Sequence, residues 1–378
     1  MHRSKGAIRV SPSTPLLSVE NLRVEFATDD GIVHAVDGIS YSIEAGRTLG
    51  IVGESGSGKS VSALTTLGLT RSSITTIQGR IVFEGRDLLT LSEEELRQIR
   101  GDDIAMVFQD PLSSLHPFYK VGSQLSEAVL AHRQVSKAAA RDRAIDLLEL
   151  VGIPDPHRRV DQYPHEFSGG MRQRAMIAMA LINEPKLLIA DEPTTALDVT
   201  VQAQILALLA DLQRRLGMAI VIITHDLGVV AEVADEIAVM YAGRIVEHAT
   251  AARLFSAPQH PYTWGLLKSI PRLTTSRDEE LEPIAGRPPS LINRPSGCHF
   301  HPRCPYVRDA HKRIDPRLLP VPDEPDHQVA CSLTPSERVE TWGSLKAGQA
   351  SADLRALAEP SSAAQPFQAF PRAQGGGA

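Results

Sequence analysis

The sequence predicts an α/β protein with a mainly parallel central sheet, an antiparallel β part, an inserted helical subdomain and a small C-terminal appendage. Two uninterrupted apolar runs, Leu187–Asp191 and Ala219–Thr224, are typical of strands buried on both faces of a parallel sheet. The segment between them, Val201–Leu216, has the spacing of an amphipathic helix. A third apolar run, residues 48–52, leads into a glycine-rich loop. Strands that alternate with helices in this way indicate a doubly wound domain.

The glycine-rich loop, Gly53–Ser60, has the spacing of a phosphate-binding loop. Its glycines let successive backbone N–H groups point into one concavity, and the helix that follows adds its positive N-terminal end. We expect Lys59 to reach the β- and γ-phosphates and the Ser60 hydroxyl to ligate Mg²⁺. A Gly/Ser turn with an incidental lysine is the alternative, but the fixed spacing favours a nucleoside triphosphate site. The residues predicted to cradle the phosphates are Gly53, Glu54, Ser55, Gly56, Ser57, Gly58, Lys59 and Ser60.

The composition is that of an ordinary soluble protein. Of the 378 residues, 42% are hydrophobic and 22% are charged. The net charge of -6 provides no basic field for nucleic acid. No apolar run of about eighteen residues predicts a membrane span, and Pro12 and Pro15 interrupt the basic N-terminus before a signal-peptide core develops. Three cysteines argue against a disulfide framework and indicate a reducing cytosol.

Changes in composition divide the chain into regions. Residues 16–255 are expected to form the nucleotide-binding domain, beginning with an alternating strand at Ser18–Phe26 and including a helical subdomain at about 92–170. Residues 256–335 are Pro-rich and predict a loop-rich C-terminal extension. The ends, residues 1–15 and 336–378, are expected to be disordered tails.

Two adjacent carboxylates follow the buried strand 187–191. Because the carboxyl ends of parallel strands meet at one sheet edge, Asp191 is expected beside the phosphate loop, where it can order Mg²⁺. Glu192 would then polarise the attacking water as general base. A solvated Asp–Glu turn is the alternative, and the phosphate loop in the same chain favours the functional interpretation.

A second glycine-containing helix start occurs at Ser168, Gly169 and Gly170, where Ser168 is a natural N-cap. Alone it fits a capped helix as well as a phosphate grip. The order of the motifs decides, because together they resemble the ATP-binding subunits of ABC transporters over about residues 17–255. The order is the phosphate loop, then Gln109, Ser168–Gly170, Asp191–Glu192, Asp198 and His225.

The resemblance implies a role for each matching position. Phe26 would stack on adenine, and Gln109 would sense Mg²⁺ and the attacking water while linking the site to a membrane partner. Asp191 would hold Mg²⁺ and Glu192 would be the base. His225 would be the switch histidine that contacts the γ-phosphate.

Two further motifs would act across a dimer interface. Residues 168–170 would close on the ATP held by the opposite subunit, and Asp198 would lie in the loop that crosses between subunits. The chain departs from the usual family pattern at Phe167 and Met171, where Leu and Gln are more common. A grip made by Ser168 and the glycine backbone should survive both changes.

Within this family the chain looks most like the peptide and nickel import branch, in particular the D-type dipeptide or oligopeptide subunit. The stretches that carry this resemblance are Gln109–Pro117, Ser168–Arg174, Ala190–Gln202 and Pro258–Thr263. The resemblance implies import powered by ATP, with two different ATPase subunits on the cytoplasmic face of the inner membrane. They would pair beneath two permease subunits, and an external binding protein would deliver a peptide, nickel or another small solute.

The three cysteines lie in the extension. Family members often carry four cysteines here, which implies an iron–sulfur cluster, and in this chain His311 stands at the third position. The set Cys298, Cys304, His311 and Cys331 could hold a 4Fe–4S cluster or structural zinc. Three unliganded buried thiols are the alternative.

Other classes of P-loop protein are disfavoured. ABC ATPases that act on nucleic acid or ribosomes usually carry two cassettes or a coiled-coil arm, and this chain has one cassette and no heptad run. A kinase or GTPase would lack Ser168–Gly170 and His225. An exporter ATPase would not explain the Pro-rich extension.

Overall fold

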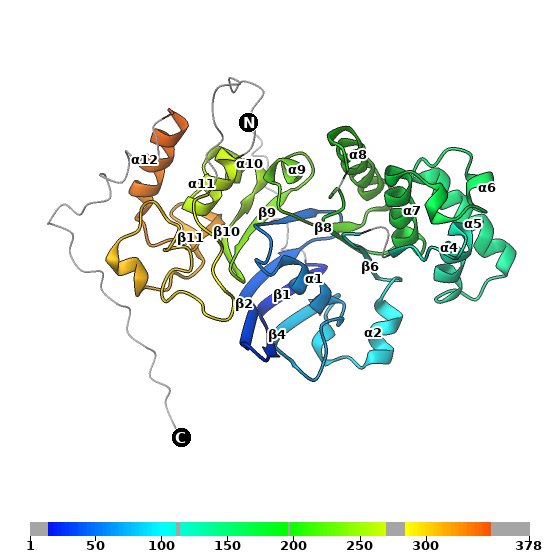
Figure 1. Ribbon diagram of the computed structural model, residues 1–378, viewed down its shortest axis with the longest axis horizontal. Helices are drawn as coiled ribbons and strands as arrows, with labels where there is room; N and C mark the ends of the chain where they lie inside the picture. Colours follow the sequence, from blue (N-terminus) through cyan, green and yellow to red (C-terminus); the bar gives the residue numbers. More distant parts are fainter. Residues whose placement is uncertain (1–13, 111–113, 196, 270–283, 349–378) are drawn as a thin grey trace, which may run out of the picture.

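The computed structural model describes residues 14–110, 114–195, 197–269 and 284–348. Figure 1 shows two sheets at its centre, a helical region beyond one end of the larger sheet and the C-terminal extension at the other. Most of the two predicted tails, residues 1–13 and 349–378, lies outside the described residues, as do 111–113 and Ala196 of the motif stretches.

The antiparallel β part is a four-stranded sheet in the order β2-β1-β4-β5. β1 (Leu17–Thr28) pairs with β2 (Gly31–Ile43) on one side and with β4 (Thr75–Phe83) on the other. β5 (Arg86–Asp87) closes the edge beside β4. β1 contains the predicted strand 18–26 and alternates buried with exposed positions, as a sheet with one covered face requires.

The main sheet has eight strands in the order β11-β12-β10-β9-β3-β8-β7-β6. The five from β9 to β6 run parallel, and β10, β12 and β11 add antiparallel strands at one edge. The strands predicted at 187–191 and 219–224 are confirmed as β7 and β8, and both are buried along their whole length. The bounds are β3 (Thr48–Val52), β6 (Ile104–Val107), β7 (Leu187–Asp191), β8 (Ala219–Thr224), β9 (Glu236–Tyr241), β10 (Arg244–Thr250), β11 (Leu319–Val321) and β12 (Glu324–Val329).

Helices cover the sheet and form the subdomain. The α-helices are α1 (Lys59–Thr66), α2 (Glu93–Ile99), α4 (Val121–Leu130), α5 (Lys137–Leu150), α6 (Pro156–Arg159), α7 (Gly169–Leu181), α8 (Val199–Leu216), α9 (Leu227–Ala231), α10 (Ala251–Ser256), α11 (Pro261–Lys268) and α12 (Pro335–Lys346). Short 3₁₀ helices occupy Leu88–Thr90, Pro164–Glu166 and Asp309–Lys312. The predicted helix 201–216 is confirmed as α8, which begins two residues earlier.

Two hydrophobic cores lie on opposite faces of the main sheet. Successive residues of β7 and β8 alternate between them, so that Leu188 and Ile220 face one core and Ile189 and Val221 the other. The first core also joins α4, α5, α7 and the extension, and the second joins the antiparallel sheet, α1 and α2. Burial on both faces explains why these strands read as continuous apolar runs.

Two predicted boundaries are wrong. The sequence predicts a helical subdomain at about 92–170, but β6 within that range is a strand of the main sheet, and α2 packs against the antiparallel sheet's core. The subdomain consists of α4 to α7 and continues to Leu181. The sequence predicts a disordered tail from residue 336, but α12 continues to Lys346 and buries Trp342 and Leu345 against the first core.

In the part of the chain that the structure describes, no helix is both long and apolar enough to cross a membrane.

Candidate nucleotide site

The phosphate loop turns tightly between β3 and α1, and its glycines are required by close backbone approaches. A Cβ atom on Gly58 would lie 2.2 Å from the Ala35 carbonyl oxygen, and one on Gly53 would lie 2.1 Å from that of Met240. Gly58 also has a φ of +97°, which favours glycine. The loop is therefore clamped between β2 and β9 while its outer residues, Ser55 and Gly56, stay exposed.

Lys59 lies inside the loop. Its Nζ donates to the carbonyl oxygens of Gly53 at 2.7 Å and Glu54 at 3.0 Å. Burial lowers the pKa of Lys59, and the charges of Glu192, Asp191 and Glu54 oppose that shift. Nζ also donates to the Ser57 hydroxyl at 3.4 Å. An ammonium whose hydrogen-bond acceptors are all neutral is a strong attractor for phosphate oxygens, because a charged acceptor makes a stronger hydrogen bond.

Ser60 and Asp191 come together as the sequence predicts. The Ser60 hydroxyl donates to the Asp191 carboxylate at 3.0 Å, although the two residues are 131 positions apart. Burial, reinforced by the adjacent Glu192, raises the pKa of Asp191. The Ser60 hydroxyl and the Asp191 carboxylate therefore offer two adjacent oxygen ligands. Such oxygens fit Mg²⁺, which prefers them together with substrate phosphates.

Glu192 is held by several groups at the carboxyl edge of the sheet. Gln109 donates its Nε2 to Glu192 Oε2 at 3.0 Å, and Thr195 donates its hydroxyl to the same oxygen at 2.7 Å. His225 Nδ1 lies 3.4 Å from Glu192 Oε1. The backbone of Glu192 has a φ of +47°, and its N–H donates to Ile223 at 2.8 Å. The structure thus gathers the three predicted catalytic residues, and it adds Thr195, which sequence reasoning missed.

The other predicted nucleotide contacts are Ser168–Gly170, Asp198 and Phe26. Ser168 caps α7 by accepting from the Met171 N–H at 3.3 Å, and Ser168 and Gly169 are exposed. Among the described residues, no hydrogen bond or ion pair joins Ser168–Gly170 to the phosphate loop. Asp198 caps α8 through Val201, and Phe26 is half-buried on β1. The roles of these residues therefore stay predictions.

The four candidate ligands in the extension line one small cavity of about 10 Å³. That volume is near the minimum for a single water molecule. Burial raises the pKa of the Cys331 thiol to about 12 and also raises that of Cys304. His311 already accepts the Arg308 N–H through Nδ1, at 3.2 Å. No group of three or more His, Cys, Asp or Glu in the described ranges is placed to hold a metal ion. The structure therefore does not support the predicted iron–sulfur or zinc site formed by Cys298, Cys304, His311 and Cys331.

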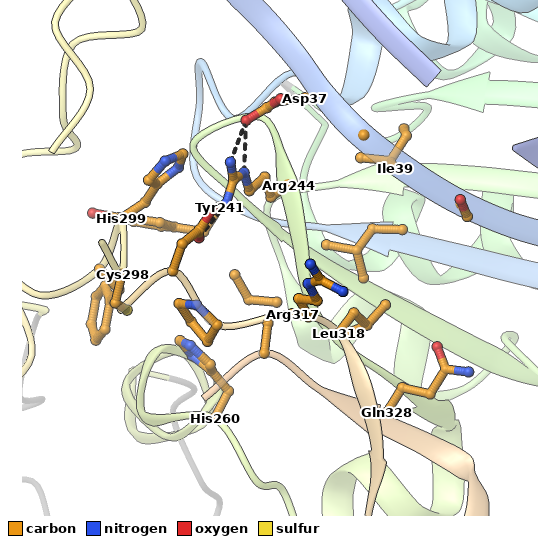
Figure 2. Close-up of a pocket in the computed structure, with 18 of the residues that line it drawn as sticks. Asp37, Ile39, Tyr241, Arg244, His260, Cys298, His299, Arg317, Leu318 and Gln328 are labelled. Atoms are coloured by element: carbon orange, nitrogen blue, oxygen red, sulfur yellow. Dashed lines mark hydrogen bonds and ion pairs between the residues drawn. The ribbon is translucent and has the colours of Figure 1, made fainter. Parts of the chain in front are cut away.

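A larger cavity of about 560 Å³ lies between the antiparallel sheet and the extension (Figure 2). None of the predicted phosphate-binding or catalytic residues lines it. Its wall contains Asp37, which accepts from Arg23, Arg244 and Arg294. Burial favours neutral Asp37, but the hydrogen bond and charge of Arg244, with the other two guanidinium groups, hold the pKa of Asp37 below its ordinary value. These ion pairs join β1 and β2 to β10 and the extension.

Comparison with known proteins places both parts of the chain. Residues 36–195 match the family model described as ABC transporter, and residues 246–310 match the one described as oligopeptide/dipeptide transporter, C-terminal region. The chain is 54% identical to the oligopeptide transport ATP-binding protein OppD of Bacillus subtilis, over 82% of this chain and 87% of that protein. It is 56% identical to the dipeptide transport ATP-binding protein DppD of the same organism, over 84% of this chain and 94% of that protein.

Solved structures agree on the cassette. The dimeric ATP-binding cassette MJ0796, in a post-hydrolysis state with ADP and Pi, is 27% identical and has a TM-score of 0.56. The match covers 62% of this chain and 98% of that cassette. The chain cbiO1 of Clostridium perfringens, part of the ABC transporter complex cbiONQ, is 31% identical over 65% of this chain and 92% of its own length, with the same TM-score.

Proposed function

We propose that this chain, which belongs to the ABC transporter family and within it to the oligopeptide and dipeptide ATP-binding subunits, hydrolyses ATP to power the import of short peptides. The observation that carries the proposal is that a hydrolytic site and the oligopeptide/dipeptide C-terminal region occur in one chain. The relatives OppD and DppD are named for oligopeptide and dipeptide transport, which favours peptides over nickel or another solute.

The residues of the site divide the work of hydrolysis. Lys59 and the loop N–H groups bind the β- and γ-phosphates, and Ser60 and Asp191 would hold Mg²⁺, which neutralises charge developing on the phosphate oxygens. Glu192 accepts the proton of the attacking water as general base. Gln109 and Thr195 hold Oε2 of Glu192, and Oε1, which lies 3.4 Å from His225 Nδ1, is the oxygen that would accept the proton of the water.

The site is proposed to be completed by a second, paralogous ATPase subunit. Ser168 and Gly169 are exposed at the positive start of α7, where their N–H groups can approach a γ-phosphate held by a neighbour. The solved cassette MJ0796 is described as dimeric, which supports this pairing. In the heterodimer, Phe26 would stack on adenine and Asp198 would lie at the interface.

The membrane partners are proposed to dock beside Gln109. Just before α4, Phe118 is 81% exposed and Tyr119 is 59% exposed, and large exposed apolar groups of this kind mark interaction surfaces. The two ATPase subunits would pair beneath two permease subunits, so the chain would be a peripheral subunit on the cytoplasmic face of the inner membrane. An external solute-binding protein would deliver the peptide.

The test is ATP hydrolysis in a complex reconstituted in vesicles with its permease subunits, partner ATPase and binding protein. We expect di- or oligopeptides to stimulate phosphate release, and the Glu192→Gln variant of this chain to suppress the stimulated rate. Stimulation by Ni²⁺ and not by any peptide would contradict the peptide assignment. Activity that requires ribosomes or DNA would contradict the transport function.

A further inference from the structure

The phosphate loop makes an ion pair with the C-terminal extension. Arg303 donates to both carboxylate oxygens of Glu54, the second residue of the loop, at 2.5 and 3.0 Å. The Arg303 side chain is only 3% exposed and that of Glu54 is 28% exposed. A partly buried bidentate ion pair is among the stronger polar contacts in a protein, because its two parallel hydrogen bonds fix the geometry of both side chains.

The same loop residue is held a second time through its backbone. The Glu54 N–H donates to the Tyr262 hydroxyl of α11 at 2.8 Å. Tyr262 packs against Tyr241 and Phe300, with ring centroids 4.7 and 5.5 Å apart. The extension therefore grips both the main chain and the side chain of Glu54, and a cluster of aromatic rings keeps that grip rigid.

Arg303 is itself anchored in the extension. Its guanidinium donates to the carbonyl oxygens of Ala285 at 3.0 Å and Ile284 at 3.2 Å, and lies 5.8 Å from the centre of the Tyr241 ring. These contacts fix the side chain independently of Glu54. Arg303 is thus a rigid cation delivered to the phosphate loop by a region that contributes none of the catalytic residues.

The charge of Glu54 gives this contact a consequence for nucleotide binding. Glu54 is a residue of the loop that must accept a polyanion, and its backbone carbonyl accepts a hydrogen bond from Lys59. Its carboxylate therefore places a negative charge in the phosphate-binding loop. An uncompensated carboxylate there would repel the triphosphate, and the repulsion would be weakly screened because the site is partly buried. Arg303 cancels that charge and holds the loop in place.

We propose that Arg303 is a positioning residue for the nucleotide, through which the extension sets the affinity of the phosphate loop for ATP. This inference rests on the proposed function, because it takes ATP to occupy Gly53–Ser60. Arg303 does not touch the reacting atoms. Its effect falls on binding, so it is expected to change the KM for ATP far more than kcat.

The experiment measures binding of a fluorescent ATP analogue to the full chain and three variants. We expect Arg303→Gln to weaken binding about tenfold, since it leaves the Glu54 carboxylate unpaired beside the phosphates. The double variant Glu54→Gln with Arg303→Gln should recover to within about threefold of the parent, because the repelling charge is gone. The matched control is Arg308→Gln, which breaks an Arg–Glu pair with Glu337 inside the extension and should leave affinity unchanged.

The outcomes separate the hypotheses. Parental affinity in Arg303→Gln, or a double variant as weak as the single one, would overturn the role of Arg303, since removing the repelling charge would then not restore binding. If Arg303→Gln does not fold, Arg303→Lys is the substitute, because lysine keeps the positive charge but cannot make the two parallel hydrogen bonds of the guanidinium. It should bind the analogue about threefold more weakly than the parent. Unchanged binding would again overturn the proposal. A parent chain that does not bind the analogue at all would refute the proposed function itself.

Discussion

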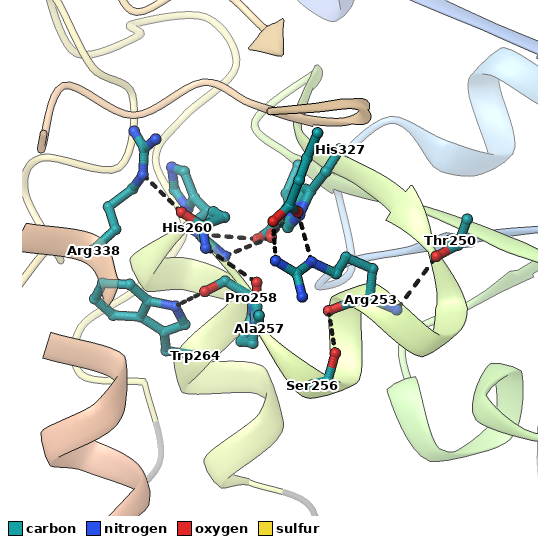
Figure 3. Close-up of polar contacts among 12 residues, drawn as sticks. Thr250, Arg253, Ser256, Ala257, Pro258, His260, Trp264, His327 and Arg338 are labelled. Atoms are coloured by element: carbon teal, nitrogen blue, oxygen red, sulfur yellow. Dashed lines mark hydrogen bonds and ion pairs between the residues drawn. The ribbon is translucent and has the colours of Figure 1, made fainter. Parts of the chain in front are cut away.

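Replacing Glu247 by alanine should detach the extension from the cassette. Glu247 lies on β10 and is completely buried. Its carboxylate accepts from the backbone N–H groups of Gln259 at 2.6 Å and His260 at 2.9 Å, and His327 Nε2 of β12 lies 2.8 Å from it. Figure 3 shows the surrounding network, in which Trp264 donates to the Pro258 carbonyl and Arg253 donates to the carboxylate of Glu324 on β12.

The magnitude follows from what the substitution leaves behind. Three donors, all on buried residues, would lose their acceptor, and each unsatisfied donor costs about 1–3 kcal/mol. Water entering the vacated space would hydrogen-bond to some of these donors. We therefore expect the free energy of unfolding to fall by about 3–5 kcal/mol, as for other broken buried pairs. That loss raises the unfolding constant of the extension by roughly two to four orders of magnitude.

The chain carries its own probe for this measurement. Its two tryptophans, Trp264 and Trp342, both belong to the extension, with ring centroids 6.4 Å apart. Urea unfolding followed by tryptophan fluorescence therefore reports the extension directly. Glu236→Ala is the matched control, because Glu236 of β9 pairs with His248 of β10 but is 49% exposed, and it should cost at most about 1 kcal/mol. A Glu247→Ala midpoint equal to that of the control would refute the reasoning.

Three further predictions concern the nucleotide site. Glu192→Gln should bind ATP like the parent but release phosphate at least about 100-fold more slowly, because the base is lost while the phosphate contacts remain; a parental rate would contradict this. Asp191→Asn should abolish Mg²⁺-dependent hydrolysis yet stabilise the nucleotide-free chain at neutral pH. Because the pKa of Asp191 is raised, the contribution of Asp191 to the parent's stability is fully present below the ordinary pKa of 3.8 and is lost as pH rises through the raised pKa. The thermal unfolding temperature should therefore vary less with pH in the variant. Gly58→Ala should destabilise the chain by about 1–3 kcal/mol and prevent binding of a fluorescent ATP analogue, since its Cβ would meet the Ala35 carbonyl; normal binding would show that the loop can shift.

The sequence was most informative where one local pattern determines both structure and chemistry. The strands Leu187–Asp191 and Ala219–Thr224 were predicted residue for residue, because burial on both faces forces continuous apolar runs. The contact between Ser60 and Asp191 followed from the rule that parallel strands end at a common edge. Thr195 was missed because a threonine in a loop has many possible partners, and its bond to Glu192 depends on the turn between them.

The sequence was least informative about contacts between distant segments. Glu247 reads as an ordinary strand residue, and only the pairing of β10 with β12 and the approach of residues 259–260 make it a buried acceptor. Arg303 and Glu54 are 249 positions apart, and no local pattern couples them. β6 was absorbed into the predicted helical subdomain, because its four residues, Ile104–Val107, are too short to stand out between charged helices.

The continuity of the main sheet determines where this chain can be cut. Because β12 hydrogen-bonds to β10, a polypeptide ending near residue 255 would present β10 as an open edge and leave the Glu247 carboxylate without Gln259, His260 and His327. Such a truncated cassette would be prone to aggregate by edge-to-edge pairing. Grafting this C-terminal region onto a different cassette would succeed only if β10, Glu54 and Tyr241, whose ring packs against Tyr262 and Phe300, were transferred with it.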